Sequence, residues 1–419
     1  MPAPLQSIDF SGNQARVDAA LIPFDALNYM FWGKWVKWNT VKAKAVDPHG
    51  GILAQPVANS PIVAQRNLRD NNGNLAKYVE MPMFRQLVEM PRLGTQQLSG
   101  EEEERKINFN RIYVDAVRHG EKVRQGRLTK EMVKGYQIEP TSRSALLMHY
   151  ARFSNFAQIP SALYKGFSYN VLNSGTWASD ANVKVNSHPN FFTTAGGRVA
   201  WGTDYPGTAG YETNVATAVE ALGLTHKLSL GFLTELASED AIRRIPKLIT
   251  KNGDPFLIFV AHPLVFKDLQ KDPEYRAWAN NVFVSQLAKE NSQLANCAIY
   301  GAGFAVFDGG NAVYPLSASG GAITYGPTVA NLNSFDNYSS YNKFGNFILG
   351  DNAIGKALAW DMEFTGEIRD HGDIETVGYT VGEGYARNQY INRDDGTEGQ
   401  YLICDTSAIV ACYADQPSY

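Results

Sequence analysis

Acidic and histidine side chains that could carry out chemistry are concentrated in a few places along the chain. Four consecutive glutamates, Glu101–Glu104, have the carboxylates that hard divalent cations prefer. The segment RDHGDIE places Asp370, His371 and Asp373 together, which are the residue types of a metal or general-base site. A run of like charges is usually solvated, so we interpret the glutamate run as a charged surface. RDHGDIE has no second ligand cluster beside it, so we interpret that segment as a polar turn.

His262 is a third candidate, since it follows the apolar segment PFLIFVA (255–261). Enzymes with parallel sheets place chemistry at such strand ends. We interpret His262 instead as a strand-end histidine that is hydrogen-bonded to the backbone.

Recognisable catalytic motifs are absent from the sequence. The seven histidines form no i, i+4 pair, and Cys297, Cys404 and Cys412 lie in no C-x-x-C arrangement. There is also no G-x-S-x-G, P-loop or dinucleotide-binding fingerprint. We therefore predict no catalytic residue, metal or cofactor. A metal-dependent hydrolase that uses Asp370, His371, Asp373 and Glu101–Glu104 is the enzyme alternative.

Composition narrows the class of protein. The 419 residues, 44% of them hydrophobic, suffice for two or three domains with sizeable cores. A net charge of −4 argues against a protein that works by neutralising phosphates. No apolar run reaches 18 residues, so we expect no membrane-spanning helix.

Two strands joined by an unusually long connection are predicted between residues 77 and 118. Lys77–Arg85 and Lys106–Arg118 both carry strand-like alternation. The connection between them is about 20 residues long, which is rare inside a compact domain. It predicts an arm that reaches a neighbouring copy of the protein. Pro82 predicts that the first strand is an edge strand, and a shift of the apolar phase predicts a bulge or a sharp twist near Asn110 and Arg111.

Helices and a central strand are predicted further along. In Thr141–Gln158 a helix is indicated by Leu146, Tyr150 and Phe153 on one face, and Pro160 is expected to end it. PFLIFVA predicts a strand that is buried on both faces. Further helices are expected at 238–251, 274–287 and 353–360.

Trp32, Trp35 and Trp38 recur every three residues in YMFWGKWVKWN. Three interpretations are open: an arm that packs on a neighbouring subunit, a nucleic-acid stacking surface, or a short helix whose rings enter the subunit's own core. The acidic balance disfavours the second.

Four sequence blocks, in order, resemble the major capsid proteins of tailed bacteriophages, in a podophage-type branch of the Hong Kong 97 fold. They are RLGTQQLSGEEEE with the following INFNRIYVDAVRHGEK, then PFLIFVAHPLVFKDLQKDPEYRAWANN, ILGDNAIGKALAW and IRDHGDIETVGYTVG. The first 70 residues carry no such resemblance.

The resemblance implies an α+β, Hong Kong 97-like fold in five parts. These are an N-terminal arm (1–70), an extended loop with a β-hairpin (71–120), a peripheral domain with a long spine helix (121–235), an axial α/β domain (236–360) and a C-terminal return to the peripheral domain (361–419). The implied function is a structural subunit whose pentamers and hexamers form an icosahedral head shell around double-stranded DNA. An encapsulin-type nanocompartment shell, which shares the fold, is the alternative.

The implied partners are other copies of the chain, a portal, and a scaffold or decoration protein, with no membrane involved. The resemblance also implies that DNA is enclosed without sequence-specific binding. It implies that the protein is made in the cytoplasm of a bacterial host and is located in the virion. In the shell we expect the acidic arm, Glu101, Glu102, Glu103 and Glu104, to contact a neighbour's basic cluster. The residues of that cluster are Arg118, Lys122, Arg124, Arg127 and Lys130. A solvated loop is the alternative interpretation of the basic cluster.

Overall fold

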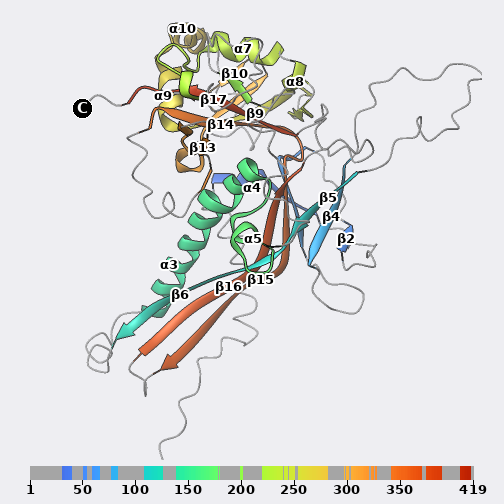
Figure 1. The fold of residues 1–419 in the computed structure, drawn as a ribbon, viewed down its shortest axis with the longest axis vertical. Coiled ribbons are helices and arrows are strands. Elements are labelled where there is room, and N and C mark those ends of the chain that lie inside the picture. Colours follow the sequence, from blue (N-terminus) through green and yellow to red (C-terminus); the bar gives the residue numbers. More distant parts are fainter. Residues whose placement is uncertain are drawn as a thin grey trace, which may run out of the picture.

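A computed structural model gives the fold. It describes residues 31–39, 51–53, 59–66, 77–83, 108–125, 138–177, 179, 199–201, 219–238, 240–243, 245–250, 253–281, 297, 299–301, 303–319, 322–324, 326–327, 341–369, 374–388 and 406–416. Two large sheets organise these residues, one at each end of the molecule (Figure 1).

The five-stranded sheet carries the long helix of the protein. Its strands, in spatial order, are β1 (Val36–Asn39), β3 (Ile62–Arg66), β15 (Ile354–Arg369), β16 (Ile374–Arg387) and β6 (Asp115–Gln125). Beyond the short β1 and β3, the strands β15, β16 and β6 continue as a three-stranded extension, and the long helix lies along it (Figure 1).

The seven-stranded sheet lies at the other end, together with most of the shorter helices (Figure 1). Its strands are β10 (Ile299–Gly301), β11 (Phe304–Asp308), β9 (Pro255–Ala261), β14 (Lys343–Leu349), β17 (Ser407–Tyr413) and β7 (Val199–Trp201), with β8 (Leu248–Ile249) beside β9. The accompanying helices are α7 (Leu230–Ser238), α8 (Asp240–Arg243), α9 (Pro263–Lys271) and α10 (Pro273–Asn281). The prediction for PFLIFVA is confirmed, because β9 is central and buried from Phe256 to Ala261.

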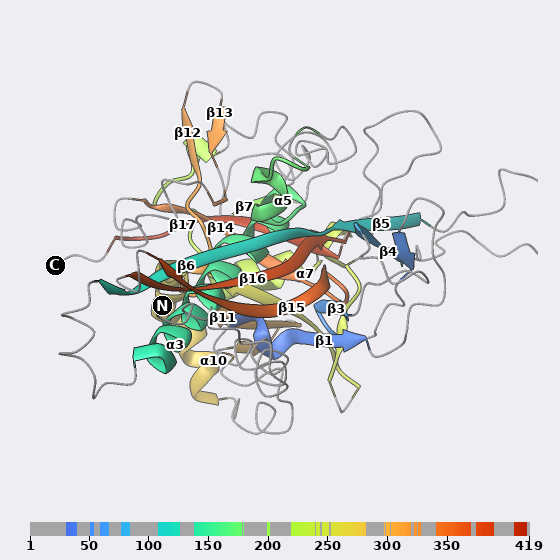
Figure 2. The ribbon, with the colours of Figure 1, turned by 90° about the horizontal axis from the view of Figure 1, so that it is seen from below.

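A small sheet projects beside the five-stranded one (Figure 2). It contains β2 (Gly51–Leu53), β4 (Tyr78–Met83) and β5 (Asn108–Tyr113), and a separate hairpin joins β12 (Ser317–Ser319) to β13 (Ala322–Thr324). The two predicted strands are confirmed as the antiparallel pair β4–β5. β2 pairs with β4 at residues 78–80, so β4 is the middle strand of this sheet and the predicted edge strand is wrong; Pro82 lies beyond the residues that pair with β2. The connection between β4 and β5 lies outside the described residues.

The predicted bulge is wrong, because the β4–β5 register runs unbroken through Asn110 and Arg111. The chain instead leaves one sheet for another at Val114, between β5 and β6. The Val114 N–H donates to Lys77 O at 3.1 Å, and the Val114 carbonyl accepts from Trp177 Nε1 at 3.0 Å. These bonds fix the direction in which the β4–β5 ribbon leaves the sheet.

Small residues let the root of the ribbon approach the large sheet closely. A Cβ on Gly384 would lie 1.7 Å from Tyr113 O, and one on Gly355 would lie 2.3 Å from Ile112 Cδ1. The contact is the second apolar cluster of the subunit. Its buried members include Tyr78, Val79, Met81, Ile112, Tyr113, Phe167, Trp177, Ala357 and Ala386.

The long helix is confirmed, but its predicted end at Pro160 is wrong. It runs from α3 (Ile138–Phe153) through a π-helical turn, η2 (Ser154–Gln158), into α4 (Ile159–Lys165). Residue 160 lacks the N–H that would bond to Phe156 O in an α-helix or to Asn155 O in a π-helix. Other donors bond to both carbonyls: Tyr314 OH to Phe156 O, and Trp32 Nε1 to Asn155 O at 3.1 Å. The helix passes the proline because tertiary contacts replace the missing bonds.

Two shorter helix predictions are also wrong. Residues 353–360 form the start of strand β15, since pairing with β3 and β16 overrides the helix preference of the Ala- and Leu-rich sequence. In the predicted helix 238–251, α8 ends at Arg243, before Pro246, and Leu248–Ile249 pair with β9. The predicted helix 274–287 matches α10 as far as Asn281.

The chain passes between the sheets at defined residues. It leaves the ribbon for the five-stranded sheet at Val114. It returns from the seven-stranded sheet to the five-stranded one between Leu349 and Ile354. Inside segment 1–70, β1 and β3 belong to the five-stranded sheet, and within 361–419 the last strand, β17, joins the seven-stranded one.

The tryptophan segment lies inside the subunit. Phe31–Trp35 form a 3₁₀ turn, η1, and the Trp32 and Trp35 side chains are 0% exposed. The ring of Trp35 meets Phe307 of β11 edge-on at 5.0 Å. The prediction that Trp32 and Trp35 contact a neighbouring subunit is therefore wrong. Both side chains belong to the subunit's own core. Trp38, in β1, is half-buried against the same core.

Trp32→Phe tests the bond that supports the π-helical turn. The variant keeps an aromatic ring in the core but removes the donor to Asn155 O, so a buried carbonyl loses a partner. We expect the free energy of unfolding of the unassembled subunit to fall by about 1–3 kcal/mol. Denaturant unfolding measures this, with Trp38→Phe as the half-buried control. Equal losses in the two variants would contradict a special role for the Trp32 bond.

Candidate functional site

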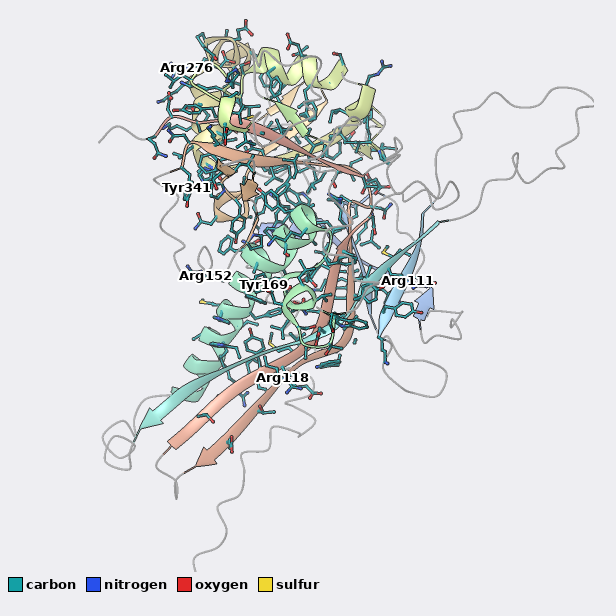
Figure 3. The ribbon with its side chains drawn as sticks, viewed as in Figure 1. Arg111, Arg118, Arg152, Tyr169, Arg276 and Tyr341 are labelled. Atoms are coloured by element: carbon teal, nitrogen blue, oxygen red, sulfur yellow. The ribbon has the colours of Figure 1, made fainter. Side chains whose placement is uncertain are left out.

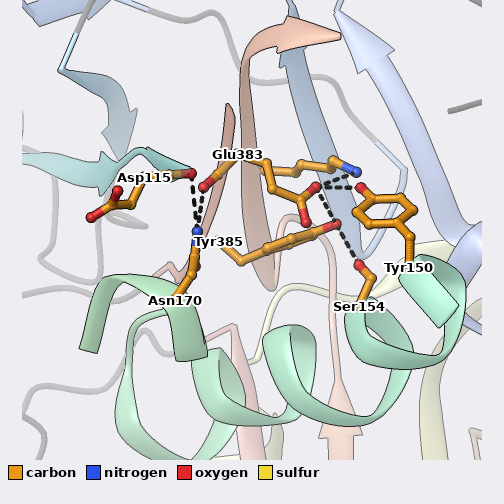
Figure 4. Close-up of polar contacts among 7 residues, drawn as sticks. Asp115, Tyr150, Ser154, Asn170, Glu383 and Tyr385 are labelled. Carbon is orange, nitrogen blue, oxygen red and sulfur yellow. Dashed lines mark hydrogen bonds and ion pairs between the residues drawn. The ribbon is translucent and has the colours of Figure 1, made fainter. Parts of the chain in front are cut away.

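A buried ion pair lies between the five-stranded sheet and the long helix (Figure 4). Lys356 of β15 and Glu383 of β16 are 1% and 0% exposed, and Lys356 Nζ lies 3.3 Å from Glu383 Oε2. Buried charges are expensive unless they are paired and hydrogen-bonded. The surroundings of Glu383 supply that compensation.

Two tyrosines bond to one oxygen of the carboxylate, Oε2, while Oε1 is buried without a hydrogen-bond partner. Tyr150 OH, from α3, donates to Glu383 Oε2 at 2.6 Å, and Tyr385 OH lies 3.3 Å from the same oxygen. Tyr385 OH also shares a hydrogen bond of 2.9 Å with Ser154 Oγ, from the π-helical turn. Strand β16 and the helix are therefore joined through polar groups at two successive turns.

The charge states of this network follow from its surroundings. Burial opposes the Lys356 charge, but Tyr385 and Glu383 outweigh it and raise the pKa of the lysine. Burial, with the negative charge of Glu383, raises the pKa of Tyr150 and raises that of Tyr385 to about 12. At neutral pH the lysine is therefore charged and both tyrosines keep their protons as donors.

A structural role fits this network better than a catalytic one. Tyr150, Ser154 and Tyr385 are, like the ion pair, at most 2% exposed. A substrate would reach these groups only if the helix left the sheet. The arrangement instead fixes the position of the helix along β16.

Asn170, in α5 (Tyr169–Asn173), extends the network to the start of β6 (Figure 4). Its Nδ2 donates to Asp115 O at 3.1 Å and to Glu383 O at 2.9 Å. Its backbone N–H donates to Gln158 Oε1, at the end of the π-helical turn, at 3.1 Å. One side chain thus joins the point where the ribbon enters the sheet to the strand that carries Glu383.

His262 has the role predicted for it. Its Nδ1 accepts from Leu264 N at 3.3 Å, which caps α9, and its ring stacks on Phe344 at 3.8 Å. Burial lowers its pKa to about 3, so the ring is neutral in the folded protein over the physiological range.

Three of the predicted basic residues, Arg118, Lys122 and Arg124, lie on β6, and Figure 3 shows Arg118 on the three-stranded extension. Arg127, Lys130 and Glu101–Glu104 lie outside the described residues. So do Asp370, His371 and Asp373, which lie in the sequence between β15 and β16.

The three-stranded extension has one face against the helix and one face away from it. His119 of β6, Tyr379 of β16 and Phe364 of β15 are neighbours across the three strands. Each contacts α3. The ring of His119 stacks on His149, the ring of Tyr379 meets Tyr150 edge-on, and Arg143 lies over the ring of Phe364. The adjacent row therefore points away from the helix. Its members are Arg118, Thr380 and Glu363.

This open face has a basic edge and an acidic edge. Arg118 and Glu363 are exposed, with the neutral Thr380 between them. A second row lies four residues further along each strand. It places the Lys122 position on β6, Thr376 on β16 and Glu367 on β15. We call this surface the open sheet face.

Sequence reasoning missed the Lys356–Glu383 network. A signal was present, because Glu383 interrupts the apolar alternation of Val381 and Tyr385 in β16. Tyr150 and Ser154 likewise follow Leu146 at four-residue intervals on the buried helix face.

Within the part of the chain that the structure describes, no cluster of three or more His, Cys, Asp or Glu side chains is arranged to hold a metal ion. None of the described helices is long and apolar enough to cross a membrane.

No family model and no curated protein sequence matches the chain. Solved structures do. A chain from the capsid of Ralstonia phage GP4 aligns over 91% of this chain and 96% of its own length, with a TM-score of 0.56 and 13% identity. The chain has a phage capsid fold. A chain from the capsid of cyanophage Pam1 aligns over 90% of this chain and 94% of its own length, with a TM-score of 0.53 and 13% identity.

The predicted α+β, Hong Kong 97-like phage capsid fold is thereby confirmed. At 13% identity the likeness concerns the fold, and residue roles have to be argued from this chain's own contacts.

Lys356→Met tests the ion pair inside this capsid fold. Removing one partner leaves the Glu383 charge buried without its counter-ion, which costs about 3–5 kcal/mol in comparable pairs. The double variant Lys356→Met with Glu383→Gln removes both charges and should recover part of the loss. Urea unfolding of unassembled subunits gives both values. A double variant as unstable as the single one would show that the charges themselves are not what matters.

Proposed function

We propose that the protein is a phage major capsid protein, a structural subunit without enzymatic activity. Its pentamers and hexamers form an icosahedral head shell around double-stranded DNA. The observation that carries the proposal is the phage capsid fold, which extends over about nine tenths of the chain rather than over one domain. In such a shell each subunit repeats the same contacts under closed symmetry.

The β4–β5 ribbon suits a subunit that reaches a neighbour. A two-stranded ribbon is marginally stable alone. Here β2 pairs with β4 at residues 78–80, and the second apolar cluster buries the root of the ribbon. Its far end leads into the long connection that contains Glu101–Glu104. On this proposal the rigid root aims the connection, and the contact with a neighbour stabilises it.

The basic edge of the open sheet face is the proposed receiving surface. Arg118 is exposed there, and the Lys122 and Arg124 positions continue along β6 towards Arg127 and Lys130. The proposed contact is between this edge and the glutamates of a neighbouring subunit. Each exposed ion pair contributes only about 0–1 kcal/mol, so the effect depends on repetition around the shell.

The remaining partners follow from the same proposal. A portal would replace one pentamer, and a scaffold or decoration protein would assist or cover the shell. The net charge of −4 supports containment of the DNA rather than tight, sequence-specific binding. The protein would be made in the cytoplasm of the bacterial host and end in the virion.

Electron microscopy of the protein expressed alone tests the proposed function. We expect closed shells, or free pentamers and hexamers that close when the other head proteins are co-expressed. A monomer that forms neither under both conditions would contradict the proposal. Shells that enclose a co-purified cargo protein would favour the encapsulin-type alternative.

Charge reversal tests the proposed contact. Arg118→Glu with Lys122→Glu should reduce the particle yield while the unfolding midpoint of the subunit stays unchanged. Glu101→Lys with Glu103→Lys should do the same, and the four changes together should restore assembly.

The matched control reverses the other edge of the same face, through Glu363→Lys with Glu367→Lys. We expect these subunits to assemble normally. Normal yield from the basic-edge variant, or no recovery in the fourfold variant, would rule out the contact.

A further inference from the structure

Two histidines from distant parts of the chain stack on each other between the sheet and the helix. His119 of β6 and His149 of α3 have ring centroids 3.9 Å apart and planes inclined by 12°. Both residues are exposed at one edge, so solvent can deliver protons to them. The pair lies on the helix-facing side of the three-stranded extension, about one helical turn from Leu146 and next to Tyr150.

The groups around the pair do not favour a second positive charge. The His149 Nδ1 shares a 3.2 Å hydrogen bond with Tyr379 OH of β16. Arg152 follows His149 by one turn on α3. Partial burial, then His119 and Arg152, lower the pKa of His149. On β6, Arg118 points to the other face of the sheet, and the position of Glu121, two residues from His119 in the same row, has its backbone paired with Val377.

Tyr379, Lys356 and Tyr150, which lie on the elements packed around the pair, have pKa values above the range in which an imidazole titrates. The pKa of Tyr379 is raised by burial and by Glu383, and those of Lys356 and Tyr150 are raised as well. Arg143 lies over Phe364 on the same side of the sheet. Tyr150, Tyr379 and Lys356 therefore keep their protons between pH 8 and 5, the range in which an imidazole ordinarily changes its charge.

We propose that the His119–His149 pair is a pH-sensitive contact that holds the first half of α3 on the sheet when it is neutral and releases it in mild acid. Two neutral imidazoles stack favourably, whereas two imidazolium rings at this separation repel each other. Because Tyr150 and Ser154 remain bonded, the release affects residues 138–149 and leaves the rest of the helix in place.

The direction of the pH dependence follows from linkage. The pKa of His149 is lower in the folded subunit than the usual value of about 6.5 in an unfolded chain. The unfolded state therefore binds more protons below that value. The stabilisation by the pair is fully present above about pH 6.5 and is lost as the pH falls through the folded pKa.

Hydrogen exchange of the unassembled subunit, followed by mass spectrometry at pH 7.5 and pH 5.0, tests the proposal. After correction for the intrinsic pH dependence of exchange, we expect protection of peptides from 138–149 to fall about tenfold for each unit by which the pKa is lowered. Peptides from 150–165 should keep their protection. His119→Phe keeps a ring in the stack but cannot be protonated, so it should show no such fall.

Equal loss of protection in the wild type and in His119→Phe would overturn the proposal. If His119→Phe does not fold, His149→Phe and an NMR titration of the wild-type imidazoles decide it. A His149 pKa at or above 6.5 in the folded subunit would overturn it as well. All of these measurements use unassembled protein, so their outcome is independent of whether the subunit forms shells.

Discussion

The π-helical turn Ser154–Gln158 is the constraint on which the rest of the subunit depends. It exists because Pro160 cannot donate the next helical bond, which leaves two carbonyls open to partners from elsewhere in the chain. Groups of this one turn bond to four separate segments, through Tyr385, Trp32, Tyr314 and Asn170. Those segments belong to the five-stranded sheet, the tryptophan turn, the region beside the seven-stranded sheet and the helix that holds the root of the ribbon. A single irregular turn therefore joins both ends of the molecule.

The buried ion pair complements this turn by setting the register of the helix on the sheet. Replacing such a pair by apolar side chains is often neutral or stabilising, so Lys356 and Glu383 are poor candidates for a source of stability as such. They do provide positional information. Tyr150 bonds to Glu383 and Ser154 bonds to Tyr385, one helical turn apart. If the helix slid by one turn, both bonds would be lost and the buried carboxylate would lose the donor that the helix supplies.

Local patterns were enough to predict the elements whose partners are close in sequence or that are buried on all sides. PFLIFVA reads as a central strand because it is apolar throughout, and the face marked by Leu146 and Tyr150 identifies the helix. The failures involve distant partners. Pro160 ends a helix unless Trp32 and Tyr314 supply donors, and residues 353–360 favour a helix until β3 and β16 pair with them. The periodic tryptophans likewise could not decide between a neighbouring subunit and the subunit's own core, because their partners are distant in sequence.

The charged groups that hold the helix and the charged groups that are available for contacts between subunits lie on opposite faces of the same strands. The charged groups of the central network, Lys356 and Glu383, have their partners inside the subunit and are sealed from solvent. Those of the open sheet face, such as Arg118 and Glu363, lie on exposed edges on the other side of the same strands. Exposed charges add little to the stability of a single subunit. These residues can therefore be used for contacts between subunits without weakening the fold. The same three strands can therefore hold the helix on one face, through fixed buried bonds, while the other face presents opposite charges at its two edges.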